Sequence, residues 1–137
     1  MMADFGFKFH HLGLAVPRAD EAVTFLSGLG YALGERVFDP AQNVNLMLSR
    51  HPHMPAVEII WPGNGPGPID KYVARRPSGI VYHVCFETAD RQASLAAIAA
   101  ANLNPICVAE PLPAVLFAGR AVSFYAVVGM GLIEILE

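Results

Sequence analysis

Short apolar segments with alternating polar positions run along the chain and predict β-strands. The first segment, HLGLAV from His11, is followed by an amphipathic stretch, ADEAVTFLSGLG, which predicts a helix. The segments YALGERV, VNLMLSR and AVEIIW predict three further strands. Because side chains alternate between the faces of a strand, Leu14 and Val16 are expected to pack under the helix, with His11 on the opposite face.

The same order of elements occurs a second time. The segment HVCFET from His83 lies 72 residues after HLGLAV and is followed by ADRQASLAAIAAANL, a second predicted helix, and by the strand segments PICVAE, RAVSFYAV and GLIEILE. Asp20 and Asp90 stand where a carboxylate would cap or begin each helix. The segments EIIW at Glu58 and EILE at Glu134 also correspond, with an offset of 76 residues. This self-similarity predicts two copies of one βαβββ unit.

A Gly- and Pro-rich stretch, WPGNGPGPIDKYVARRPSG, joins the two copies. It predicts a connector with a short helix that begins at Pro68, a favourable first helical residue. We predict an α+β fold with a single domain over residues 1–137. In it, tandem βαβββ modules (8–62 and 79–137), joined by the connector 63–78, form a cup-shaped mixed sheet.

Composition narrows the classes of partner. Hydrophobic residues make up 54% of the chain and charged residues 15%, so apolar surface is expected to be covered by a second subunit in a homodimer. The net charge of −3, without a cluster of Lys or Arg, argues against nucleic-acid binding. No apolar segment approaches about 18 residues and the N-terminus does not resemble a secretion signal, so we expect no membrane association and a cytoplasmic location.

Ionisable residues fall at equivalent positions of the two modules, on the strand faces away from the predicted helices. They are His11, Glu58, His83 and Glu134. Two carboxylates in strands this apolar are costly to bury alone, and two imidazoles with two carboxylates suit a borderline or hard divalent cation. The pattern therefore predicts one divalent metal ion, with Co, Ni, Zn, Mn and Fe all left open. The neighbouring His10 is expected to point under the helix or to a subunit interface.

The whole pattern resembles the vicinal-oxygen-chelate superfamily, which includes glyoxalase I, methylmalonyl-CoA epimerase, extradiol dioxygenases and antibiotic-resistance proteins. The motifs most similar to methylmalonyl-CoA epimerases are HHLGLAV, VEIIWP, PIDKYVARR, GIVYHV and GLIEIL. The resemblance implies a glyoxalase-like fold and a metal-dependent isomerase or epimerase that stabilises an enolate next to the metal-bound carbonyl of an acyl-CoA or other thioester. It also implies that Glu134 is both a ligand and a catalytic base, and that Arg120 binds a substrate carboxylate or phosphate.

The chain departs from the epimerase pattern at two positions. Epimerases usually have Gln where this chain has Glu58, and the resulting ligand set resembles that of glyoxalase I. Their catalytic Glu lies in a PE[HQ]GV loop, whereas the corresponding loop here reads PAQNV, with Ala41 in place of the base. Asp39 and Glu58 are the candidates to replace that base.

Other functions remain open on the sequence. They are a glyoxalase-I-type lactoylglutathione lyase, and a small-molecule binding or resistance protein with a vestigial metal site. An extradiol dioxygenase is less favoured because Glu58 would occupy a position that oxygen needs. His51 and His53 in the loop RHPHMP suggest a second metal site, although a solvated loop is the simpler interpretation.

Overall fold

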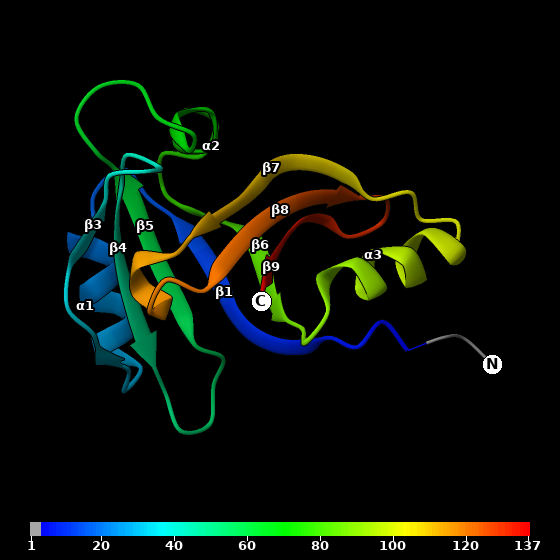
Figure 1. The fold of residues 1–137 in the computed structure, drawn as a ribbon. Coiled ribbons are helices and arrows are strands. Elements are labelled where there is room, and N and C mark those ends of the chain that lie inside the picture. Colours follow the sequence, from blue (N-terminus) through cyan, green and yellow to red (C-terminus); the bar gives the residue numbers. More distant parts are fainter. Residues whose placement is uncertain (1–3) are drawn as a thin grey trace. The chain divides into compact units, whose positions relative to one another are not determined.

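The computed structural model describes residues 4–137, which contain three α-helices and nine β-strands (Figure 1). In chain order the elements are β1 (Lys8–Ala15), α1 (Asp20–Gly28), β2 (Ala32–Leu33), β3 (Val37–Asp39), β4 (Val44–Arg50), β5 (Val57–Pro62), α2 (Asp70–Arg75), β6 (Ile80–Glu87), α3 (Arg91–Ala100), β7 (Ile106–Pro113), the 3₁₀ helix η1 (Val115–Phe117), β8 (Ala121–Val127) and β9 (Gly131–Leu136). Strands pair both parallel and antiparallel, so the fold is α+β as predicted. Among residues 4–137, no helix is both long and apolar enough to cross a membrane.

The chain divides into two compact units. The N-terminal unit consists of residues 11–82, and the C-terminal unit consists of residues 4–10 together with residues 83–137. The strand β1 begins in the C-terminal unit and continues into the N-terminal unit. Each unit has its own hydrophobic core beneath one long helix.

The N-terminal unit has the strand order β2-β4-β5-β1, and β3 also pairs with β4. β1 and β5 are parallel, whereas β4 is antiparallel to β5. Leu26 of α1 packs on one face of these strands with Val16, Met47 and Ile59, and Leu14 packs against the same cluster. The predicted helix-facing side of β1 is therefore confirmed.

The C-terminal unit repeats this order as β6-β9-β8-β7. β6 and β9 are parallel, and β8 is antiparallel to both of its neighbours. Ile98 of α3 packs with Ile133 and Ile135 of β9. The ring of Phe7 stacks on that of Phe86 with their centroids 5.2 Å apart, so the segment before β1 completes this core.

Among the α-helices of residues 4–137, only α3 begins at a side chain that accepts a hydrogen bond from a free amide of the first turn. Asp90 is the N-cap of α3 and accepts a hydrogen bond from the Ala93 amide at 3.0 Å. Asp20 instead lies in the first turn of α1, where its charge favours the helix dipole. The connector helix α2 begins at Asp70, two residues after the predicted start at Pro68, and the Asp70 carboxylate accepts a hydrogen bond from the amide of Gly67, before the helix, at 2.9 Å.

The predicted strand YALGERV is interrupted and forms the two short strands β2 and β3. Gly34 lies between them, and its amide donates to the Leu48 carbonyl at 2.8 Å. A Cβ at Gly34 would lie 2.5 Å from that oxygen, so only glycine permits the close approach. This local contact is invisible to an argument from alternation.

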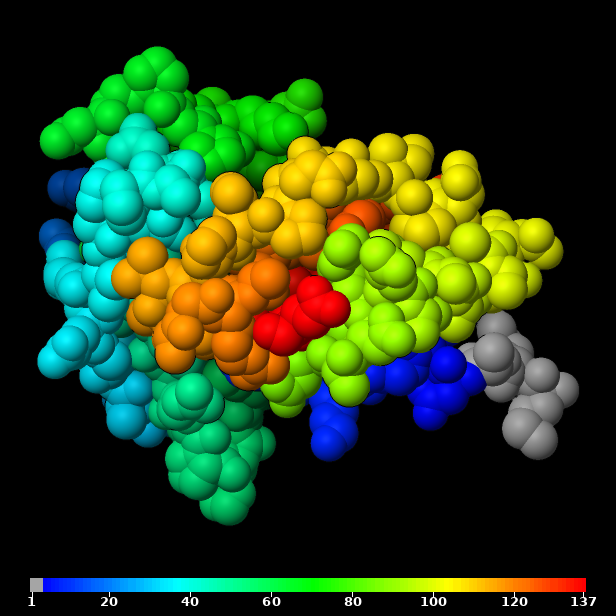
Figure 2. Space-filling view, viewed as in Figure 1, coloured from blue at the N-terminus to red at the C-terminus, as the bar shows by residue number. Residues whose placement is uncertain are grey.

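The strand β7 is exposed along most of its length and, among the strands of residues 4–137, pairs only with β8. The space-filling view shows the yellow segment that contains β7 at the surface (Figure 2). Pro111 and Pro113 remove two amide donors from this strand, and its register shifts on either side of Ala109. Prolines and bulges of this kind protect an edge strand from pairing with other chains.

Candidate metal centre

The N-terminal unit holds one buried pair of predicted ligands, His11 and Glu58. Gly13 of β1 lies opposite Glu58 of β5 in parallel register, so His11, two residues before Gly13, shares its face with Glu58. The His11 ring is fully buried and the Glu58 residue is only 4% exposed. His11 Nε2 lies 3.6 Å from Glu58 Oε1. A carboxylate buried to this extent requires a positive or hydrogen-bonding partner.

The C-terminal unit holds the equivalent pair, His83 and Glu134. Cys85 of β6 lies opposite Glu134 of β9, and His83 stands two residues before Cys85. His83 Nε2 lies 3.2 Å from Glu134 Oε1, and Glu134 is 4% exposed. The ring of Phe124 meets His83 edge to face, with the centroids 5.3 Å apart. This aromatic contact restricts the orientation of the imidazole.

The duplicated register explains why the pairs are alike. In both units the histidine precedes by two residues the position that faces the glutamate. Each pair therefore offers one imidazole nitrogen and one carboxylate oxygen on the strand face away from the unit's long helix. This donor set fits a divalent cation that accepts nitrogen and oxygen ligands, whereas two buried carboxylates are a poor match to a purely apolar core.

Arg120, the predicted substrate-binding residue, lies immediately before β8 and forms a surface ion pair. Its Nη2 lies 3.1 Å from Glu87 Oε2, and its Nε donates to the Glu137 backbone carbonyl at 3.2 Å. The Arg120 side chain is 43% exposed. Solvent screens such a pair, so its contribution to stability is small.

Asp39, a candidate for the missing base, closes the turn between β3 and β4. Its residue is 1% exposed. Oδ1 accepts the amides of Ala41 and Gln42 at 2.9 and 3.4 Å, and Oδ2 accepts Gln42 Nε2 at 3.2 Å. Both carboxylate oxygens are thus used by the turn that carries Ala41. The geometry favours a structural role for Asp39.

His51 connects its loop to the C-terminal end of α1 by a hydrogen bond. Its Nδ1 accepts the His53 amide at 3.0 Å, so Nε2 carries the ring proton and donates to the Leu29 carbonyl at 3.1 Å. Both ring nitrogens are therefore engaged in local hydrogen bonds. The structure assigns His51 to the loop rather than to a second metal site.

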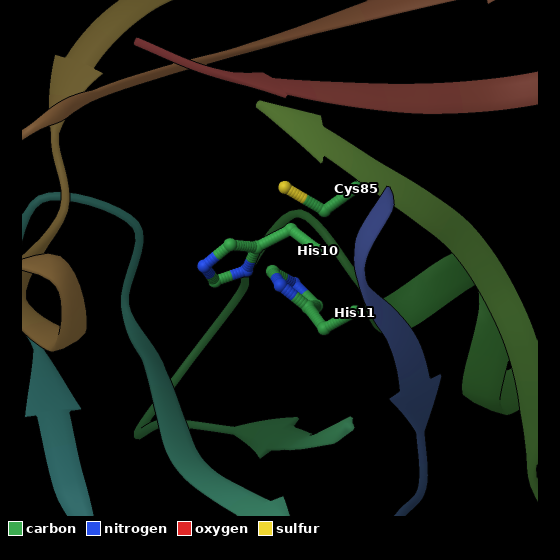
Figure 3. A group of neighbouring side chains, drawn as sticks. All are labelled: His10, His11 and Cys85. Atoms are coloured by element: carbon green, nitrogen blue, oxygen red, sulfur yellow. The ribbon is translucent and has the colours of Figure 1, made fainter. Parts of the chain in front are cut away.

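The alternation argument missed the environment of His10. Its ring meets Phe117 edge to face at 5.1 Å between centroids, and one of its nitrogens lies within 4.8 Å of the Cys85 sulfur. Figure 3 shows the side chains of His10 and Cys85 together with the next residue of β1, His11. His10 is the last residue of β1 assigned to the C-terminal unit. The expectation that His10 points under the helix or to a subunit interface did not include these contacts with Phe117 and Cys85.

Comparison with known proteins identifies the family. The model of the Glyoxalase/Bleomycin resistance protein/Dioxygenase superfamily matches residues 10–124. The mitochondrial methylmalonyl-CoA epimerase of Dictyostelium discoideum is 24% identical over 118 residues, which cover 85% of this chain and 69% of that protein. The ethylmalonyl-CoA/methylmalonyl-CoA epimerase of Cereibacter sphaeroides is 25% identical over 84 residues, which cover 61% of this chain and 62% of that protein.

A solved structure supports the same fold. The methylmalonyl-CoA epimerase from Mycobacterium tuberculosis has a TM-score of 0.78 at 19% sequence identity, and the match covers 100% of this chain and 92% of that chain. At this identity the likeness concerns the fold, which agrees with the predicted glyoxalase-like architecture. Together with the family match over most of the chain, it shows that the protein belongs to the glyoxalase/bleomycin resistance protein/dioxygenase superfamily.

Proposed function

We propose that the protein is a divalent-metal-dependent enzyme of the epimerase or isomerase type, which moves a proton at the carbon next to the carbonyl of an acyl thioester. The observation that carries this proposal is the repetition of one buried His–Glu pair, His11–Glu58 and His83–Glu134, in the same strand register. The names of the curated relatives support an acyl-CoA as the substrate class.

In this proposal a single metal ion is held by both pairs, through His11, Glu58, His83 and Glu134. The positive charge would balance two carboxylates that are each 4% exposed. When bound, a divalent ion polarises a carbonyl oxygen and stabilises negative charge that develops on it. Co, Ni, Zn, Mn and Fe all suit a set of two imidazoles and two carboxylates.

The two glutamates are the proposed catalytic groups. Glu134 accepts or returns the α-proton, and Glu58 is the second carboxylate available for the same task. Epimerisation requires proton transfer at both faces of the planar intermediate, so two groups are needed. Asp39 is not favoured for this task because its oxygens already accept three hydrogen bonds within the turn.

Arg120 is proposed to bind a carboxylate or phosphate of the substrate. A guanidinium forms paired hydrogen bonds with either group. To do so, Arg120 would exchange its exposed contact with Glu87 for the substrate anion. The cost of this exchange is small because solvent already screens the existing ion pair.

The proposal is tested by metal analysis and by exchange of the α-proton of methylmalonyl-CoA in D₂O. We expect about one metal ion per chain and metal-dependent exchange, both lost in His83→Ala. The matched control is His53→Ala, which removes an exposed histidine of the loop after β4. Metal binding that survives in His83→Ala, or exchange that proceeds equally without metal, would refute the proposal.

A glyoxalase-I-type lyase is the second candidate, and the buried Glu58 favours it. A carboxylate at this position, in place of the usual glutamine of epimerases, resembles the glyoxalase I ligand set. Isomerisation of the hemithioacetal of methylglyoxal and glutathione would distinguish this activity from proton exchange on methylmalonyl-CoA. Tight binding of a small molecule without turnover of either substrate would instead favour the resistance-protein interpretation.

We also propose a homodimer, as the composition predicts. Phe25 of α1 is 69% exposed and Val128 of the turn after β8 is 74% exposed, and both are large apolar residues. Apolar side chains on a surface are favourable sites for a second subunit. Sedimentation equilibrium measures the mass directly, and a monomer at micromolar concentration would contradict the proposal.

A further inference from the structure

The side chains of His10 and Cys85 lie together in the C-terminal unit, apart from any role discussed so far. An imidazole nitrogen of His10 lies within 4.8 Å of the Cys85 sulfur. Cys85 is fully buried, while His10 is half-buried. Figure 3 shows that the His10 ring and the Cys85 sulfur extend into the same region, with His11 following His10 in β1.

One aromatic residue positions both side chains. Phe117 of η1 packs against the cluster that contains Cys85, Val122 and Leu136. The same ring meets His10 edge to face at 5.1 Å between centroids, with an interplanar angle of 89°. The arrangement is therefore held by contacts within one unit.

The donor types differ from those of the proposed His–Glu centre. A thiolate with an imidazole is a soft-to-borderline set that prefers Zn²⁺, Cd²⁺ or Cu⁺ and disfavours Mg²⁺ and Ca²⁺. Sulfur requires deprotonation before it binds, so one proton passes to solvent for each ion that binds to Cys85. No electron transfer is involved when the ion is Cd²⁺ or Zn²⁺.

We infer that His10 and Cys85, which lie in the same unit, form a second binding position for a thiophilic metal ion. His10 provides the approach from the surface, and Cys85 supplies the strongest bond to the ion.

Titration of metal-free protein with Cd²⁺ tests the inference, because a Cd–thiolate bond gives an ultraviolet charge-transfer band that nitrogen and oxygen ligands do not give. We expect a saturable band with one Cd²⁺ per chain. Cys85→Val, which keeps an apolar side chain in the core, should abolish it, and His10→Ala should weaken Cd²⁺ binding at least about tenfold. The control is Cys107→Ser, which removes the exposed thiol and should leave the band intact.

The outcomes are separable from those for the proposed function, on which this inference does not depend. A Glu134→Gln variant should keep the Cd²⁺ band, since no carboxylate takes part. A band lost in Cys107→Ser and retained in Cys85→Val would show binding at the surface thiol and overturn the inference. No band in the wild-type protein, or equal Cd²⁺ affinity in His10→Ala, would overturn it as well. Far-UV circular dichroism verifies that each variant is folded. If Cys85→Val unfolds, His10→Ala tests the site, because it truncates only a half-buried ring.

Discussion

His83 Nε2 lies 3.2 Å from Glu134 Oε1, although 50 residues lie between the two in the chain. The parallel pairing of β6 with β9 produces this contact, and the pairing of β1 with β5 produces its counterpart between His11 and Glu58. Each pair is thus built by one strand that carries the histidine and a parallel neighbour that carries the glutamate. The duplicated unit places the same chemistry in both halves.

Replacement of Glu134 by glutamine should remove a ligand and a base together. The amide has nearly the same size but no charge, so the fold should persist. We expect loss of bound metal and a decrease in the exchange rate of about 10²- to 10⁴-fold, the usual range for a general base. Glu35→Gln, at an exposed position before β3, is the matched control and should behave as wild type. Full activity of Glu134→Gln would exclude this residue as the base.

Removal of metal with a chelator should lower the melting temperature. An ion present at 100 times its dissociation constant stabilises the folded state by about 2.7 kcal/mol. For a chain of this size we expect a decrease of several degrees in Tm, measured by differential scanning calorimetry. His83→Ala should show no such decrease on chelation. An equal decrease in both proteins would mean that the ion binds elsewhere.

Asp39→Asn distinguishes a structural carboxylate from a catalytic one. The substitution replaces one acceptor of the turn between β3 and β4 by a donor that faces Gln42 Nε2. We expect the free energy of unfolding to fall by about 1–2 kcal/mol in urea denaturation. The rate of α-proton exchange at saturating substrate should remain unchanged. A lower rate with unchanged stability would instead identify Asp39 as the replacement base.

Arg120→Ala tests the proposed substrate contact. Loss of an exposed ion pair should change stability by less than about 1 kcal/mol. If the guanidinium binds the substrate, KM for the acyl-CoA should rise while kcat is largely kept. Glu87→Ala removes the partner of the ion pair and should not raise KM. Equal kinetic constants in Arg120→Ala and wild type would show that Arg120 forms only its surface ion pair and does not bind the substrate.

The strand faces were the most predictable part of the fold. Alternation correctly placed Leu14 and Val16 under α1, because each strand has one face against a helix. The break at Gly34 was not predictable, since it depends on the approach of the Leu48 carbonyl from β4. The predicted start of α2 at Pro68 was two residues too early, since the helix begins at Asp70.

The candidate site could be predicted in part because the sequence is duplicated. The four predicted ligands are recognisable because duplication places like residues at like positions, and each histidine lies beside a glutamate in the structure. The roles of His51 and Asp39 depend on hydrogen bonds to distant or irregular backbone, which no periodic pattern contains. Whether one ion joins both pairs stays a prediction.

The stacking of Phe7 on Phe86 has a consequence for how the chain can be divided. The repeat suggests two equivalent pieces divided at the connector, but Phe5 and Phe7, two aromatic residues of the C-terminal core, come from the segment before β1. A fragment that starts at residue 79 would lack them and expose a gap beside Phe86. The C-terminal unit therefore needs a segment from the beginning of the chain. A circularly permuted chain that carries residues 4–10 after Glu137 would be the better independent module.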